Sequence, residues 1–155
     1  MSRRLGVVLG GVVLWMGASL LSRPSQSAGA ERPLLAGAQV DPQVLAIFER
    51  ACQDCHSYRT HYLWYSYIAP ISWWTENHVS SGRRHLNFST WESYPLTRKE
   101  RLLTGIANQV KEREMPLSSY LLIHQEARLS DADIDTVFQW TQKERARLFG
   151  ETDGK

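Results

Sequence analysis

The chain has 155 residues and a formal net charge of +2, a length that suits one domain with an appended segment. The charge falls to −1 without residues 1–30, which contain three arginines and no acidic residue. An almost neutral remainder argues against nucleic-acid binding, which needs a basic surface.

The first thirty positions form a candidate targeting segment. Basic Arg3 and Arg4 precede an uncharged run from Leu5 to Leu21, between a signal-peptide core and a membrane span in length. Ala28-Gly29-Ala30 is a candidate cleavage site. We expect residues 1–30 to be either a cleaved signal peptide or a retained membrane anchor. Because the positive end stays inside, either case predicts the periplasmic side of the inner membrane, anchored or soluble.

Residues 31–40 show no sustained period and predict a linker that straps onto the domain. The domain itself should occupy residues 41–149, with residues 150–155 as a flexible tail. Asp41 and Pro42 indicate a helix start. One face of this helix carries Val44, Phe48, Ala51, Cys52 and Cys55.

Both cysteines of the chain lie in Cys52-Gln-Asp-Cys55-His56, the C-x-x-C-H pattern of covalent c-type haem attachment. Thiols three residues apart on a helical turn can reach the two vinyl groups of one haem edge. We expect Cys52 and Cys55 to bind one haem c as thioethers and His56 to be its proximal iron ligand. A structural zinc site, which would lack further cysteines, and a redox pair or plain disulfide are the alternatives.

The segment after the motif is aromatic. We expect Tyr58, Tyr62, Trp64, Tyr65 and Tyr67 to lie inside, as ordinary core or around a haem. A second helix should run from position 70 to 81 and stop at Gly82, with Trp74 and His78 facing inward. Trp74 and Arg83 are candidates for the haem pocket. Arg83 and Arg84 would bind propionates, or else remain solvated on a loop.

Two later helices complete the expected fold. Thr97 and Glu100 predict a capping box for a third helix, which must end before Pro116. Ser130 and Asp133 predict another for the last helix. No alternating strand pattern appears, so we predict an all-α fold, a small cytochrome c-like domain wrapped around one covalent haem.

Met115 is the only methionine beyond residues 1–30, and Pro116 favours an extended loop there. A thioether on such a loop suits the distal iron position, so Met115 is the expected distal ligand. His78 is the alternative distal ligand, ahead of His61, His85, His124 or an open site.

With these residues in place, the chain resembles the haem-binding-domain family of small bacterial c-type cytochromes. The resemblance covers about Asp41 to Trp140 and departs at Leu63, where a proline is expected. Its matching stretches are residues 52–60, 64–66, 69–74, His78, Gly82-Arg83, 86–89, Trp91, Met115-Pro116 and 124–130. It implies haem c, export and often an N-terminal anchor, without fixing a reaction. The element order also resembles class I cytochromes c, in which the first and last helices cross beside the haem.

We therefore expect an exported monohaem cytochrome that binds haem and transfers one electron, rather than a catalyst. Its partners would be other redox proteins, and the membrane if residues 1–30 are retained. The alternative is a haem-based peroxidase or a gas or redox sensor with a displaceable distal ligand. A structural haem or metal module within a larger membrane complex is a third possibility.

Overall fold

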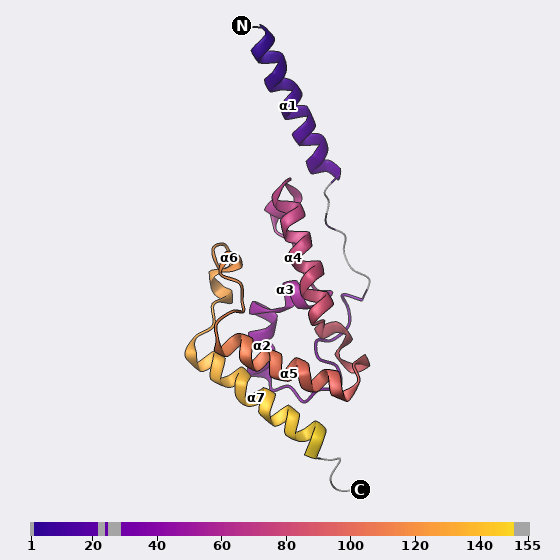
Figure 1. Ribbon diagram of the computed structural model, residues 1–155, viewed down its shortest axis with the longest axis vertical. Helices are drawn as coiled ribbons and strands as arrows, with labels where there is room; N and C mark the ends of the chain where they lie inside the picture. Colours follow the sequence, from indigo (N-terminus) through magenta and orange to yellow (C-terminus); the bar gives the residue numbers. More distant parts are fainter. Residues whose placement is uncertain (1, 22–23, 25–28, 151–155) are drawn as a thin grey trace.

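The computed structural model describes residues 2–21, 24 and 29–150, and within them every regular element is helical (Figure 1). This confirms the all-α prediction. The α-helices are α1 (Ser2–Leu21), α2 (Pro42–Ala51), α3 (Gln53–His56), α4 (Ile71–His85), α5 (Leu96–Lys111), α6 (Ser118–Leu121) and α7 (Asp131–Gly150). Short 3₁₀ turns lie between them at η1 (Trp64–Tyr67), η2 (Phe88–Ser93) and η3 (Gln125–Ala127).

The core forms where α2, α5 and α7 meet. Helix α5 runs along α7, and α2 packs on α7 as well (Figure 1). Phe48 of α2 lies at the centre, with ring centroids 5.0 Å from Phe88 and 5.2 Å from Trp140. Its burial, with that of Leu103 and Val137, removes much apolar surface from water. The first and last helices of the domain, α2 and α7, thus pack together. The resemblance to class I cytochromes c implied this contact.

Residues 31–40 are strapped onto this core. Leu35 is buried, and its amide donates to the carbonyl of Phe88 at 3.0 Å. At Gln39 the carbonyl accepts from Trp140 Nε1 at 2.8 Å, and the amide donates to Glu144 Oε2 at 3.3 Å. The strap therefore ties the N-terminal side of the domain to α7.

The expected stop of the second helix at Gly82 is wrong, because α4 continues through Gly82 to His85. Gly82 lies against the C-x-x-C-H turn, where an added Cβ would be 2.5 Å from the Cys55 carbonyl oxygen. The residue is a contact glycine inside a helix rather than a helix terminator.

The two expected capping boxes have opposite outcomes. At α7, Ser130 and Asp133 exchange the expected bonds, with Asp133 N donating to Ser130 Oγ at 3.1 Å and Ser130 N to Asp133 Oδ2 at 2.8 Å. At α5 the prediction is wrong, because the helix begins at Leu96 after an extended Pro95 and Thr97 already lies inside it. Glu100 instead pairs with Arg145 of α7 at 3.5 Å.

The aromatic segment departs from expectation as well. Trp64 is 74% exposed and Tyr67 42% exposed, so the prediction that these rings lie inside is wrong for both. On α4, Trp74 is also 47% exposed. The end of the domain formed by η1 and the start of α4 thus carries large rings on its surface.

The N-terminal segment forms the separate helix α1, which extends away from α5 and α7 (Figure 1). Among the described residues, no helix combines the length and apolarity needed to cross a membrane. Ala28 of the candidate cleavage site and residues 151–155 of the expected tail lie outside the described residues.

Candidate functional site

The C-x-x-C-H motif forms the junction of α2 and α3. Helix α2 ends at Ala51, Cys52 breaks the helical geometry, and His56 N donates to Cys52 O at 3.0 Å across the next turn. Both cysteines are free thiols. Burial raises the pKa of Cys52 to about 12 and that of Cys55 to about 11, so both sulfurs carry protons at neutral pH.

His56 is held by backbone carbonyls at the C-terminal end of α4. Its Nδ1 lies 3.1 Å from the carbonyl oxygen of Leu86 and 3.2 Å from that of Gly82. A carbonyl can only accept, so Nδ1 carries the proton and Nε2 is left with its lone pair. Burial lowers the pKa of the imidazole despite these two bonds, which favours the neutral ring. The side chain is therefore oriented and protonated as an iron ligand must be.

A main cavity opens beside this motif in two adjoining parts. The apolar part, of about 340 Å³, is lined chiefly by Phe48, Phe88, Leu102, Ile106 and Val110. The thiol part, of about 530 Å³, is lined by both thiols together with Asp54, His78, Gly82, Pro116, Leu117 and Tyr120. Both parts are lined by the same five residues, Cys52, His56, His85, Gln109 and Met115. Volumes of this order suit a cofactor.

Met115 reaches the cavity from the loop after α5. Its amide donates to Gln109 O at 3.2 Å, and Glu114 N donates to the same oxygen at 3.0 Å. These bonds fold the chain back at the end of the helix. Met115 thus lines both parts of the cavity, as His56 does.

Of the two parts of the main cavity, His78 lines only the thiol part. Its ring lies 4.3 Å from that of Trp74, edge to face, on the α4 surface that also borders a smaller pocket. The structure thus brings Met115 and His78 to the cavity, and of these two only Met115 lines both parts. His85 also lines both parts, with its Nδ1 2.9 Å from the carbonyl oxygen of Ser81. His61 and His124 border the smaller pocket instead.

Arg83 and Trp74 are not among the residues that line the main cavity. The Arg83 guanidinium donates to Ser57 O and to Thr60 Oγ1, each at 2.8 Å, and so fastens the loop after the motif. Trp74 borders the smaller pocket. The sequence analysis placed both residues in the haem pocket, and neither lines the main cavity. Arg84 is exposed on α4, with its guanidinium 3.3 Å from Ser80 Oγ.

Three cavity residues of α5 escaped the sequence reasoning, namely Arg101, Gly105 and Gln109. They recur every four residues beside the apolar positions Leu102, Ile106 and Val110, so helical periodicity could have found them. A Cβ at Gly105 would meet no atom within 4 Å, consistent with a glycine that faces open space.

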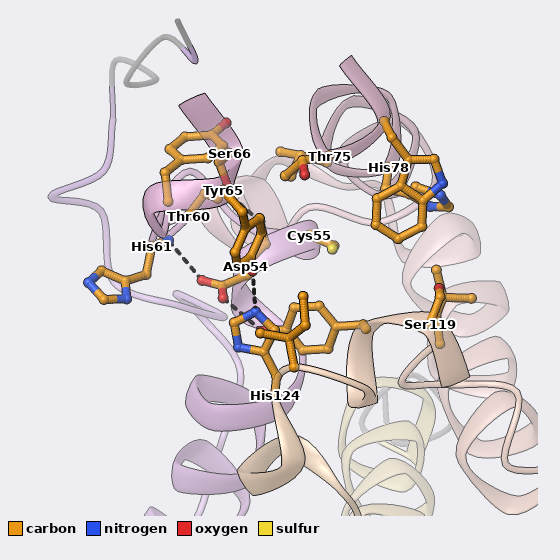
Figure 2. Close-up of a pocket in the computed structure, with 16 residues that line it drawn as sticks. Asp54, Cys55, Thr60, His61, Tyr65, Ser66, Thr75, His78, Ser119 and His124 are labelled. Carbon is orange, nitrogen blue, oxygen red and sulfur yellow. Dashed lines mark hydrogen bonds between the residues drawn. The ribbon is translucent and has the colours of Figure 1, made fainter. Parts of the chain in front are cut away.

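A hydrogen-bonded cluster supports the other side of the motif turn (Figure 2). Asp54 accepts from the His61 amide and from the Tyr120 hydroxyl, each at 2.8 Å. The Tyr120 ring stacks on His124 at 4.0 Å. His124 Nδ1 donates to Glu126 Oε1 at 3.2 Å, which leaves Nε2 to accept from Tyr65 OH at 2.5 Å. The cluster thus ties α3, η1 and α6 into one support.

Comparison with known proteins decides the family. A family model described as a haem-binding domain matches residues 12–143, which include the motif turn and the whole main cavity. The chain belongs to the haem-binding domain family. Comparisons with curated proteins and with solved structures each found no match.

The residues of this haem-binding domain fit the cofactor that its family implies. Two thiols, a neutral imidazole with a free Nε2 and a thioether line one cavity with an apolar wall. Within the described residues, no group of three His, Cys, Asp or Glu side chains is placed to hold a metal ion. The donor set of the cavity is thus that of a haem site.

Proposed function

We propose that this haem-binding domain is an exported monohaem c-type cytochrome that carries single electrons. Cys52 and Cys55 would hold the haem, His56 would be the proximal ligand and Met115 the distal ligand. The observation that carries the proposal is the placement of His56 and Met115 on the same two parts of one cavity beside both thiols.

Attachment would use the two free thiols of the motif. Each cysteine S–H would add across one vinyl C=C, so that sulfur bonds to one carbon and the hydrogen goes to the other. No oxidant is needed for this addition. Both sulfurs belong to one turn, which suits them to a single haem edge.

When bound, the haem would supply the Fe(III)/Fe(II) couple, and the surrounding residues would tune its reduction potential. The His56 ring is fixed by two carbonyl oxygens, so little rearrangement of this ligand is needed between oxidation states. Phe48, Phe88 and Ile106 give the apolar part a wall that would shield a bound haem from water. Burial and methionine ligation both favour a raised reduction potential. Arg101 on the cavity wall replaces Arg83 as our candidate for a propionate contact.

Export remains part of the proposal. Residues 1–30 would direct the chain across the inner membrane, either as a cleaved signal or as an anchor in which α1 enters the lipid. The partners would be redox proteins on the periplasmic side, met through small transient contacts.

The second candidate is a peroxidase or a gas sensor. It is favoured by one observation, that His78 and Tyr120 line the thiol part beside Met115 and could serve as acid or base groups there. It needs Met115 to leave the iron.

One comparison separates the two candidates. Purified holoprotein is exposed to carbon monoxide in the ferrous state and to hydrogen peroxide in the ferric state. A carrier keeps its ferrous spectrum under carbon monoxide and shows no peroxide turnover above that of free haem. Rapid carbon monoxide binding, or turnover abolished by His78→Ala, would favour the second candidate and contradict the carrier.

A further inference from the structure

One end of the domain, formed by η1, the start of α4 and the turn after α6, has large apolar side chains on its surface. We call it the aromatic end. Its members, with their exposed fractions, are Trp64 (74%), Tyr67 (42%), Ile71 (43%), Trp73 (57%), Trp74 (47%), Leu122 (79%) and Ile123 (60%). Monomeric soluble proteins seldom gather so many exposed apolar groups at one place, and such patches mark interaction sites.

The two chain segments of the aromatic end lie side by side. The Tyr65 hydroxyl of η1 bonds His124, which directly follows Leu122 and Ile123. Trp74 and Ile123 border the same small pocket between the segments. These contacts make the exposed side chains one surface rather than two unrelated edges.

This surface carries almost no charge. Residues 62–75 and 115–123, which build it, contain no Asp, Glu, Lys, Arg or His, and the exposed side chains of His61, Glu76 and Glu126 lie just outside these ranges. The α5–α7 side of the domain, by contrast, carries charged side chains such as Lys99, Asp135 and Lys143. A partner of the aromatic end must therefore offer an apolar surface, with polar groups for the Trp N–H and Tyr O–H, rather than a pattern of charges.

Helix α1 contacts the domain at this same end. Trp15 Nε1 donates to Ala69 O at 2.8 Å, and Ala69 N donates to Ser19 Oγ at 3.3 Å. Tyr67 and Ile68 line a shallow hollow together with Trp15, Met16, Ser19 and Leu20. Figure 1 shows α1 extending from the start of α4 away from α5 and α7.

The apolar surface of α1 thus continues into the aromatic end. Leu5, Val7, Val13 and Leu14 are all more than half exposed on α1, at 61%, 74%, 67% and 76%. A phase or partner that covers these side chains of α1 would therefore also meet the domain at Ala69 and its neighbours. A lipid phase covers such a helix and places Trp and Tyr rings at its boundary with water.

We propose that the aromatic end rests on the lipid surface, with Trp64, Tyr67 and Trp74 at the headgroup level while α1 is embedded beside them. The inference deepens the proposed function, because it requires residues 1–30 to be retained as an anchor. Tryptophan and tyrosine suit this place, since their rings are apolar and their N–H or O–H groups stay hydrated. The domain would then be held at a fixed tilt rather than tethered loosely.

The test uses the full-length holoprotein in vesicles of phosphatidylethanolamine and phosphatidylglycerol. A photoreactive residue is introduced by Trp64→benzoylphenylalanine or Leu122→benzoylphenylalanine, two exposed positions in different segments of the aromatic end. Val12→benzoylphenylalanine reports on α1, and Gln139→benzoylphenylalanine on exposed α7 is the matched control. Mass spectrometry counts lipid adducts after illumination, and the visible haem spectrum checks that each variant is folded.

We expect lipid adducts at positions 64 and 122 several-fold above those at 139. Adducts at position 12 with none above control at 64 and 122 would overturn the inference while leaving the anchor intact. Absence of adducts at all four positions, or a purified chain that lacks residues 1–30, would remove the anchor and the inference together. A crosslink from 64 to a second copy of the chain would also overturn it.

Discussion

A Cβ atom at Gly82 would lie 2.5 Å from the carbonyl oxygen of Cys55, so α4 meets the C-x-x-C-H turn through a bare glycine. The Gly82 carbonyl also accepts from His56 Nδ1 at 3.2 Å. Gly82 therefore sets the separation between α4 and the turn and, together with the Leu86 carbonyl, the orientation of the His56 imidazole.

Gly82→Ala should destabilise the holoprotein by about 1–3 kcal/mol, because backbone must move to admit the methyl group. An ordinary glycine inside a helix behaves oppositely and gains about 0.5–1 kcal/mol on replacement by alanine. Denaturant unfolding, followed by circular dichroism, measures the difference. Asn77→Ala, on an exposed position of the same helix, is the control and should change the stability little. A stabilised Gly82→Ala protein would show that the close contact with Cys55 is absent.

Met115→Ala should change the ferric spectrum and lower the reduction potential, because the iron loses a ligand that favours the ferrous state. His78→Ala should leave both unchanged. Visible spectroscopy and a redox titration of the two purified variants provide the measurement. The opposite result, with His78→Ala altering the spectrum and Met115→Ala silent, would assign the distal position to His78.

Tyr120→Phe should cost about 1–2 kcal/mol of stability, because Asp54 Oδ2 loses the donor it holds at 2.8 Å. Burial and the neighbouring Asp54 charge raise the pKa of the Tyr120 hydroxyl, so the bond should survive to alkaline pH. Tyr58→Phe is the matched control, since Tyr58 contacts Arg83 through its ring. Equal unfolding midpoints for the two variants would mean that the Asp54 contact contributes nothing.

Asp133→Asn should lower stability at neutral pH by about 1 kcal/mol. Burial raises the pKa of the Asp133 carboxyl, but bonds from Ser130 and Arg50 outweigh it and leave the pKa below its ordinary value. A depressed folded-state pKa contributes stability above the ordinary carboxyl pKa and loses it as the pH falls through the depressed one. The difference between wild type and variant should therefore vanish on strong acidification.

Denaturant unfolding at several pH values tests this cap, with exposed Asp135→Asn as the control. A difference that stays constant from neutral to strongly acidic pH would mean that the Asp133 charge is not responsible.

Local patterns in the sequence were sufficient for the motif turn and the last helix. The C-x-x-C-H spacing specifies one turn, and Ser130 with Asp133 specifies a helix start, each within a few residues. Met115 was also recognisable, as the one thioether beyond residues 1–30. The distal assignment itself remains a prediction.

Contacts between distant segments were not readable in this way. Gly82 looks like a helix stop until the Cys55 carbonyl lies beside it. Trp64 and Tyr67 look like core residues, but composition does not reveal that Trp64 is exposed and that Tyr67 lies beside α1. Arg83 looks like an anion ligand, although Ser57 and Thr60 hold its guanidinium.

The most direct test of covalent haem binding is haem staining of a denaturing gel, paired with the intact mass. The stain and the mass are recorded for the protein after export from a host that matures c-type cytochromes. Wild type should stain and weigh one haem more than its polypeptide. Cys52→Ser or Cys55→Ser should stain more weakly, and the double variant should not stain. A colourless wild type with the mass of bare polypeptide, or full staining of the double variant, would contradict attachment through these two thiols.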